Sequence, residues 1–356
     1  MRIFQGPRYS HARWRAISAA ATLWVALAAH AATPEWQPET GDIDAATALA
    51  LAQSLTEKVE SRALRPRDQA EYDAAKSKLL ELVTAPSTSL ERARVYAAAN
   101  AMLATLDTDG HTQLWSKQLA SSWESSTTPE TARDTTATRI IATPGGPVLV
   151  VRPPQATFLN PELIRQYAQA LIDGVDQAVG DASPCALVVD LGDQKGGNAW
   201  PGLAALSPLF TAANTARFVD RDGRRTPVVA NATAYTASLG KLPHNELIRF
   251  AGQPFAVVMT PQTASAGEML AIALRGEPGV RWFGQPSWGA TTGNTVETLP
   301  DGATVLLTVA RYGFGTEPAL RGKLMPDVPA AVGEVPEATL ARAAAWAAQS
   351  CRKATP

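Results

Sequence analysis

Two patterns of apolar residues divide most of the chain. Between residues 43 and 106, apolar positions recur every three or four residues in AATALALAQSLTEKVESRAL, RDQAEYDAAKSKLLELVTA and SLERARVYAAANAMLATL. This spacing is typical of amphipathic helices. Asp68 and Ser89 begin the second and third of these segments and are expected to be N-caps. The pattern predicts a small N-terminal helical domain over residues 42–106.

From residue 147 onward, short continuous apolar runs alternate with helix-like segments. The runs GPVLVVRP, CALVVDLG, PFAVVMT, VRWFG, TVETLP and ATVLLTVARYGF predict strands, and RTPVVANATAYTA is expected to be extended. Helices are expected in NPELIRQYAQALIDGVDQAVG, AWPGLAALSPLF, SAGEMLAIALRG and PEATLARAAAWAAQS. This alternation indicates the α/β class, with a mainly parallel, covered sheet over residues 147–350. The Ser- and Thr-rich segment 107–146 is expected to be a loop and linker with a marginal strand.

The first 31 residues have a third pattern. Four arginines, at positions 2, 8, 13 and 15, precede the apolar run AISAAATLWVALAA, which ends in the small-residue site AHA. These features predict a cleaved secretory signal peptide over residues 1–31. The apolar run is short for a bilayer span, and an uncleaved membrane anchor is the alternative. We therefore expect a periplasmic or secreted protein without an integral membrane span after cleavage.

The composition further limits the possible classes of function. A hydrophobic content of 46% and a charged content of 18% are ordinary for a globular protein. The formal net charge of −1, without a basic stripe, gives no indication of a nucleic-acid partner. Cysteine and histidine are too few and too scattered for a zinc site, so neither a metal nor another cofactor is expected. Cys185 and Cys351 could form one disulfide after export, but free thiols are equally compatible with the sequence.

Ser265 lies in the segment TASAGE, between an expected strand and an expected helix. In an α/β protein this position is at the carboxyl edge of the sheet, beside the free amides of a helix's first turn. The adjacent Ala266 would donate its backbone N–H to an oxyanion hole. Serine is also a common N-cap, so a purely structural role is the alternative interpretation.

A serine nucleophile needs a base, and outside the expected signal peptide the chain has only His111 and His244. His111, in LDTDGHTQL, is the preferred candidate, and His244, in LGKLPHNELIRF, is expected on the surface. Gly196 and Gly197 follow the strand CALVVDLG and could supply a second oxyanion donor. A simple tight turn would also explain these two glycines.

Together, these segments resemble peptidase family S41 over most of residues 100–330. Six motifs match in the same order: DGHT (109–112), DLGDQKGGN (190–198), TPQTASAGE (260–268), GQPSWGATTGN (284–294), LPDG (299–302) and PDV (326–328). The resemblance implies an α/β core of the ClpP/crotonase kind. It also implies that Ser265 is the nucleophile, that His111 is the base, and that Ala266 and Gly196 or Gly197 form the oxyanion hole.

The departures from the family pattern refine this expectation. Ala290 stands where the carboxyl-terminal processing branch has its lysine base, so the chain is more similar to the tricorn-like branch, which uses histidine. That branch has an acidic residue at the position of Arg321, and Glu317 is the nearest substitute. Gly192, Asp193 and Gln194 replace an Arg-Gly-Asn sequence. The segment between His111 and the strand at residue 147 is too short for a PDZ domain.

The resemblance therefore implies an exported serine peptidase that hydrolyses peptides or unfolded chain ends through an acyl-enzyme. One alternative is a catalytically weakened binding protein for peptides or apolar ligands, motivated by the altered glycine loop and by Arg321. Another is an esterase with the same Ser-His pair. Four tryptophans near the motifs could line a substrate groove or pack in the core: Trp115, Trp200, Trp282 and Trp288.

Overall fold

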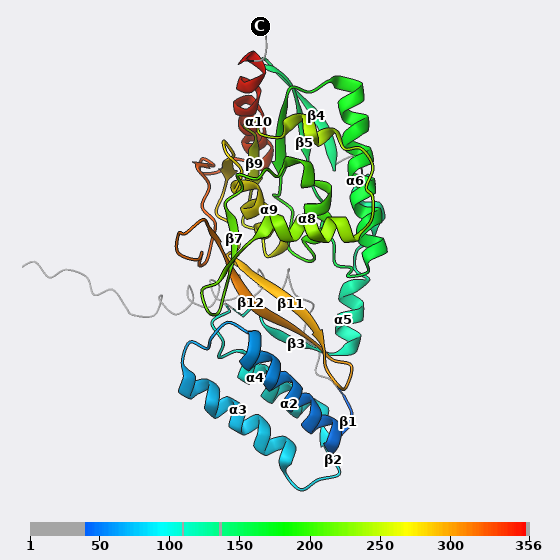
Figure 1. Cartoon of the computed structure of the whole chain (residues 1–356), viewed down its shortest axis with the longest axis vertical. Helices are drawn as coiled ribbons and strands as arrows, with labels where there is room; N and C mark the ends of the chain where they lie inside the picture. The colour runs from blue at the N-terminus through cyan, green and yellow to red at the C-terminus, as the bar shows by residue number, and fades with distance from the viewer. Residues whose placement is uncertain (1–39, 109, 135–136, 354–356) are drawn as a thin grey trace, which may run out of the picture. The chain divides into compact units, whose positions relative to one another are not determined.

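The computed structural model describes residues 40–108, 110–134 and 137–353 (Figure 1). The expected signal peptide at residues 1–31 lies outside these ranges. Within them, no helix is long and apolar enough to cross a membrane.

The central element is a six-stranded sheet with the strand order β13-β10-β9-β6-β5-β4. All neighbouring strands are parallel except β4 and β5, which are antiparallel. The predicted α/β class with a mainly parallel sheet is therefore confirmed. The strands are β4 (Thr138–Thr143), β5 (Gly146–Val151), β6 (Ala186–Asp190), β9 (Ala256–Met259), β10 (Arg281–Gly284) and β13 (Val328–Pro329).

Helices cover both faces of this sheet. They are α6 (Pro161–Ala182), α7 (Trp200–Ala205), α9 (Ala266–Arg275) and α10 (Pro336–Ala347). Because successive strand side chains point to opposite faces, Leu149 and Leu187 share a core with α6, α7 and α9. Val148 and Val188 instead pack with α10 on the other face. Burial on both faces explains why these strands are continuously apolar.

A second sheet is antiparallel, with the order β11-β12-β7-β8 and with β3 paired to β12. Its strands are β3 (Gln113–Trp115), β7 (Ala216–Asp220), β8 (Arg225–Pro227), β11 (Thr292–Thr298) and β12 (Thr304–Phe314). Strands at 295–300 and 303–314 are expected from the sequence, and β11 and β12 overlap both. Their membership in a separate sheet is not, because it depends on pairing with strands about 90 to 190 residues away in the chain.

Three N-terminal helices lie side by side, and the first and last of them contact this second sheet (Figure 1). They are α2 (Ala45–Arg62), α3 (Gln69–Thr84) and α4 (Arg92–Leu103), accompanied by the short strands β1 (Asp42–Asp44) and β2 (Ser89–Glu91). Their core includes Leu299, Val305 and Leu307, so the helical region shares its apolar interior with strands from the other end of the chain. Asp68 caps α3 as predicted. The predicted cap at Ser89 is wrong, because this residue lies in β2 and α4 begins at Arg92.

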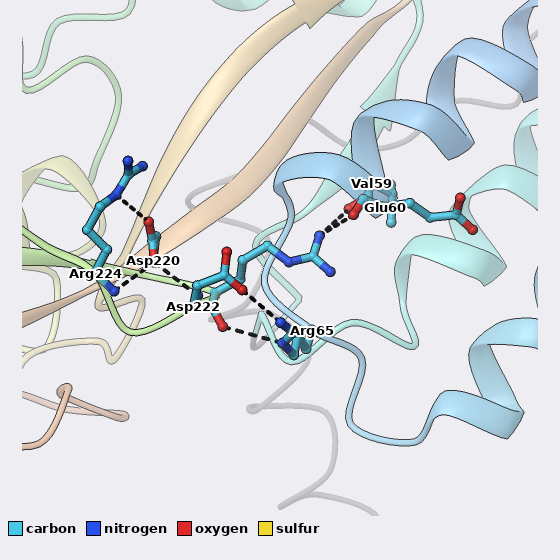
Figure 2. Close-up of polar contacts among 7 residues, drawn as sticks. Val59, Glu60, Arg65, Asp220, Asp222 and Arg224 are labelled. Carbon is cyan, nitrogen blue, oxygen red and sulfur yellow. Dashed lines mark hydrogen bonds and ion pairs between the residues drawn. The ribbon is translucent and has the colours of Figure 1, made fainter.

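Polar contacts also join α2 to the turn between β7 and β8 (Figure 2). Arg221 donates hydrogen bonds to the carbonyl oxygens of Val59, at 3.3 Å, and of Glu60. Arg65 donates to the Asp222 carboxylate at 2.7 Å. A cation near the last carbonyls of a helix is favourable because that end carries partial negative charge. These contacts hold the end of α2 against the second sheet.

Two further segments differ from the expectation. Residues 225–237 are expected to be extended, but only 225–227 form a strand, and helix α8 (Val228–Ser238) follows. The valines and threonines suggested a strand, but Val228 and Ala232 are buried and Tyr235 stacks on Trp200 with ring centroids 4.9 Å apart. The segment expected to be a loop and linker contains β3, β4 and helix α5 (Lys117–Glu124), which Ser116 caps by accepting the Leu119 N–H at 3.1 Å. The short 3-10 helices are η1 (Pro129–Arg133), η2 (Ser207–Leu209), η3 (Glu246–Phe250) and η4 (Ala348–Lys353).

Cys185 and Cys351 form a disulfide, with their Cα atoms 5.3 Å apart. The bond joins the segment just before β6 to η4, across 166 residues of sequence. It therefore fixes the C-terminal end of the chain to the central sheet. The sequence left this pairing open because it carries no information on the distance between the two residues.

Reduction of this disulfide is expected to lower the free energy of unfolding by about 2–5 kcal/mol, because an open chain has more conformational freedom when unfolded. Denaturant unfolding with and without dithiothreitol measures the effect. Because the chain has only these two cysteines, the double variant Cys185→Ala/Cys351→Ala is expected to show no response to the reductant. Equal unfolding midpoints for oxidised and reduced wild type would contradict the expectation.

Candidate active site

Two neighbouring parallel strands end at the same edge of the central sheet. β6 leads into the glycine-rich loop at residues 191–198, and β9 leads into the turn that carries Ser265. Carboxyl ends of parallel strands are where α/β proteins usually place their sites. The turn and the loop are joined there, because the Ala264 N–H donates to the Gln194 carbonyl at 3.0 Å. Thr263 adds a hydrogen bond from its hydroxyl to the Leu191 carbonyl at 2.9 Å.

Ser265 has an unusual backbone conformation, with φ 48° and ψ −106°. Only one other non-glycine residue in the described ranges, Ser183, has a positive φ. This combination lies outside the regions that L-residues favour and costs about 1–3 kcal/mol, so the surrounding structure must hold it. An ordinary N-cap residue is extended instead. Ser265 is the N-cap residue of α9, and Glu268 accepts its N–H as in a capping box, but its conformation is not that of an ordinary N-cap.

The Ser265 hydroxyl contacts His111. The distance from Ser265 Oγ to His111 Nε2 is 3.0 Å, although 153 residues separate the two in sequence. Both side chains are half-buried. His111 comes from the segment that leads into β3, so the second sheet supplies the histidine and the central sheet supplies the serine. Asp109, which begins the DGHT motif, lies outside the described residues.

Two residues of β11 contact the same imidazole. Thr292 Oγ1 lies 2.6 Å from His111 Nδ1, and Asn294 Nδ2 lies 3.1 Å from His111 Nε2. Asn294 Oδ1 accepts a hydrogen bond from the Thr308 hydroxyl at 2.7 Å, which fits the amide nitrogen pointing toward His111. An amide nitrogen only donates, so we assign the imidazole proton to Nδ1 and leave Nε2 as an acceptor. This is the tautomer that can take a proton from Ser265, whose hydroxyl shares the single lone pair of Nε2 with the Asn294 N–H.

The two glycines have different surroundings. A Cβ on Gly196 would lie 3.3 Å from the Ser265 Cβ, whereas a Cβ on Gly197 would lie 2.2 Å from the Ala156 carbonyl oxygen. Gly196 is therefore the glycine beside the serine, and Gly197 packs against the segment that follows β5. Within the described residues, the N–H groups of Gly196 and Ala266 donate to no protein acceptor. Both amides are thus available to a negative oxygen near Ser265.

The loop that bears these glycines is fixed by buried polar contacts. Asp190 accepts two hydrogen bonds from the Arg152 guanidinium, at 2.6 and 3.0 Å, and one from the Gly192 N–H at 2.9 Å. The buried Gln194 side chain donates to the carbonyls of Pro153 and Pro154. The sequence Gly192-Asp193-Gln194 therefore forms an anchored loop in this chain.

Glu317, suggested as the orienting acid, is exposed in the turn after β12. Its backbone N–H bonds to the Phe314 carbonyl, and no hydrogen bond between described residues joins its side chain to His111. The suggestion followed sequence proximity, whereas the turn directs Glu317 toward solvent. Arg321 instead pairs with Asp107, at 2.7 Å, and Arg311 pairs with the same carboxylate at 3.1 Å. Burial raises the pKa of Asp107, but the two guanidinium groups outweigh that effect and lower it below its usual value.

The remaining candidates divide between surface and core. His244 is exposed and contacts Glu246 at 3.0 Å, as expected for a surface histidine. Trp115 and Trp282 are buried, and Trp200 is half-buried. Trp288 is 40% exposed, and its backbone N–H donates to the carbonyl of Thr263, two residues before Ser265. Of the four tryptophans, Trp288 is therefore the one accessible beside the nucleophile turn.

Thr292 and Asn294 were not singled out from the sequence. They lie in the segment GQPSWGATTGN, which carried only a motif match, and their role depends on β11 passing beside His111. The described residues contain no group of three or more His, Cys, Asp or Glu side chains arranged to hold a metal ion.

Thr292→Val should lower kcat/KM for peptide hydrolysis by up to about tenfold, the equivalent of one ordinary hydrogen bond. The substitution keeps the shape of the side chain and removes the oxygen beside His111 Nδ1. Thr291→Val is the matched control, because the Thr291 hydroxyl bonds to the Gly322 carbonyl at 3.0 Å. If steady-state kinetics gave equal losses for both variants, the contact with His111 would have no specific role.

Comparison with known proteins points to a peptidase family. Residues 163–329 match the profile of peptidase family S41. The chain is 33% identical to the nisin-resistance protein of Lactococcus lactis subsp. lactis over 126 residues, which are 35% of this chain and 39% of that protein. The match therefore spans well under two thirds of this relative.

Solved structures extend the similarity of fold over most of the chain. A lipoprotein from Streptococcus agalactiae superposes with a TM-score of 0.64 at 18% identity, covering 88% of this chain and 98% of that one. The photosystem II D1 C-terminal processing protease superposes with a TM-score of 0.53 at 16% identity, covering 84% and 97%. The family profile includes both the glycine-rich loop and Ser265. Residues 163–329, just under half of the chain, are thus similar to peptidase family S41.

Proposed function

We propose that this protein is an exported serine peptidase that hydrolyses peptides or unfolded chain ends through an acyl-enzyme on Ser265. The observation that carries the proposal is the 3.0 Å contact between Ser265 Oγ and His111 Nε2. A nucleophile and base within hydrogen-bond distance are the basic requirement of this chemistry. The match of residues 163–329 to peptidase family S41 supports peptide bonds as the substrate class.

In the proposed acylation, Ser265 Oγ attacks the scissile carbonyl carbon while His111 Nε2 takes the hydroxyl proton. The carbonyl oxygen becomes an oxyanion near the N–H groups of Gly196 and Ala266. The tetrahedral intermediate then collapses, the C–N bond breaks, and His111 returns the proton to the leaving amine. Water repeats the sequence in the second half: it loses a proton to His111, attacks the acyl carbon and releases the carboxylic acid from Ser265.

Two features support the oxyanion part of the proposal. The Ala266 amide is at the N-terminal end of α9, where the helix dipole favours negative charge. The Gly196 amide belongs to a loop held by the Asp190–Arg152 pair, so it need not reorganise during the reaction. Donors of this kind contribute about 10²–10³-fold each to kcat in serine peptidases.

Export is supported by the N-terminal sequence and by the disulfide. The segment 1–31 has the arginines, the apolar run and the small-residue site of a signal peptide. The Cys185–Cys351 bond is typical of an oxidising compartment such as the periplasm or the cell exterior. We propose a periplasmic or secreted location; N-terminal sequencing of the protein from cell fractions tests it, and retention of Met1 in the cytoplasmic fraction would contradict it.

The function is tested by supplying the purified protein with an unfolded polypeptide and, separately, with activated esters. Mass spectrometry of the products identifies any cleaved peptide bonds. New termini that are absent when Ser265→Ala replaces the wild type are the expected result. Ester turnover without peptide cleavage would favour an esterase. Binding of peptides without any turnover would favour a binding protein on this scaffold.

A further inference from the structure

Glu268 is the last residue of the TASAGE segment, and the proposed mechanism gives it no part. It lies in the first turn of α9 and is fully buried. Burial raises the pKa of its carboxyl group, although the hydrogen bonds that it accepts act in the opposite direction. Burying a carboxyl group is unfavourable unless its oxygens are hydrogen-bonded, so the arrangement of its partners indicates why it is there.

The two carboxyl oxygens hold different parts of the site. Oε2 accepts the Ser265 backbone N–H at 3.0 Å. Oε1 accepts the Gly289 N–H at 2.8 Å and a short hydrogen bond from the Ser287 hydroxyl. Ser287 Oγ in turn accepts the Leu324 N–H at 2.8 Å. One buried side chain therefore connects the nucleophile turn to the segments around residues 287–289 and 324.

The segment 287–294, which contains Ser287 and Gly289, also reaches the base, His111. The Trp288 N–H bonds to the Thr263 carbonyl at 2.9 Å, and Thr292 and Asn294 contact His111. Glu268 thus holds the backbone of the nucleophile and the start of the segment that positions the imidazole. Ser265 needs such support because its backbone conformation is unfavourable by itself.

We infer that Glu268 is a positioning residue for the reaction: it fixes the Ser265 amide, and with it the direction of Oγ toward His111. This inference rests on the proposed function for its kinetic readout. The geometry requires two acceptors, because the amides of Ser265 and Gly289 can only donate. A carboxyl group provides two acceptor oxygens. The carboxamide of glutamine provides one acceptor oxygen for one of these two backbone amides and presents an N–H group to the other.

The primary test is Glu268→Gln, compared with Glu277→Gln. Glu277 follows the other end of α9, is also buried, and accepts hydrogen bonds from Thr211 and Asn214. Both variants replace a buried, hydrogen-bonded carboxyl group next to the same helix, so both are expected to lower Tm. Only Glu268→Gln is expected to slow fluorophosphonate labelling of Ser265 and to lower kcat, each by about 100-fold, with KM nearly unchanged, because displacing a reacting group by about 1 Å has that effect.

Ser287→Ala tests whether the backbone amides or the Ser287 hydroxyl matter for the reactivity of Ser265. It removes the hydroxyl donor but leaves both amide hydrogen bonds to Glu268, so labelling is expected to stay within about threefold of wild type. The inference is overturned if Glu268→Gln is labelled within threefold of Glu277→Gln, or if Ser287→Ala slows labelling as much as Glu268→Gln does. If Glu268→Gln does not fold, Glu268→Asp replaces it, because its two oxygens are on a side chain too short to reach both amides. At least tenfold slower labelling is then expected, and the same threefold limit applies.

Hydrogen–deuterium exchange makes the inference independent of activity. The segments 261–268 and 287–290, taken together, should exchange faster in Glu268→Gln than in Glu277→Gln, because the carboxamide leaves either the Ser265 or the Gly289 amide without an acceptor. A wild type that is neither labelled nor active would contradict the proposed function, and the exchange comparison would still test Glu268. Equal exchange of the segments 261–268 and 287–290 in the two variants would overturn the positioning role.

Discussion

Ser265→Ala is expected to lower peptide turnover by at least about 10⁴-fold, and His111→Ala by a similar factor, because a nucleophile and its base act as one unit. For the same reason, the double variant should be no less active than either single one. Initial rates with a fluorogenic peptide measure all three. Thermal melts verify that each variant is folded.

His244→Ala is the matched control for this experiment. His244 is exposed and contacts only Glu246 among the side chains described. Its replacement should leave turnover within about twofold, as surface substitutions usually do. A Ser265→Ala variant that is folded and retains more than a tenth of the wild-type turnover would exclude Ser265 as the nucleophile.

Gly197→Ala is expected to have the largest effect on stability, about 3 kcal/mol or more, because strain and overpacking act together. Gly197 has φ +104°, and its Cβ would lie 2.2 Å from the Ala156 carbonyl oxygen. The neighbouring Asn198 N–H bonds to that same carbonyl at 2.6 Å, so the loop cannot move away without losing this contact. Displacement would also shift Gly196 relative to Ser265 and reduce activity.

Gly180→Ala is the control for this substitution. Gly180 is exposed in α6, and a Cβ there would meet nothing within 4 Å. Alanine at this helical position should stabilise the protein by up to about 1 kcal/mol. Denaturant unfolding of both variants gives the comparison. Equal unfolding midpoints for Gly197→Ala and wild type would show that the loop adapts freely.

The sequence was sufficient for the features that depend on local pattern. The continuously apolar runs at 147–151 and 186–190 are strands of a covered sheet, and the strand, turn and helix around Ser265 follow the predicted order. His111 could be selected because the chain offers so few histidines. The DGHT motif then indicated the same residue.

Features that depend on contacts between residues far apart in the chain could not be predicted from the sequence. Thr292 contacts His111 only because the chain brings the start of β11 near this histidine, and no local pattern encodes that proximity. Glu317 was suggested from its position next to Arg321 in sequence, yet three-dimensional placement leaves it in an exposed turn. In α8 the β-branched residues favoured an extended segment locally, but packing against α7 overrides that preference.

The most direct test of the account is mass spectrometry of the purified protein after exposure to a fluorophosphonate. Wild type, Ser265→Ala and His111→Ala are compared side by side, with His244→Ala as control. One adduct, on Ser265, is expected in wild type and in His244→Ala, and none in the other two variants. A folded wild type without an adduct, or an adduct that persists in Ser265→Ala, would contradict the assignment of Ser265 and His111 as a working nucleophile and base.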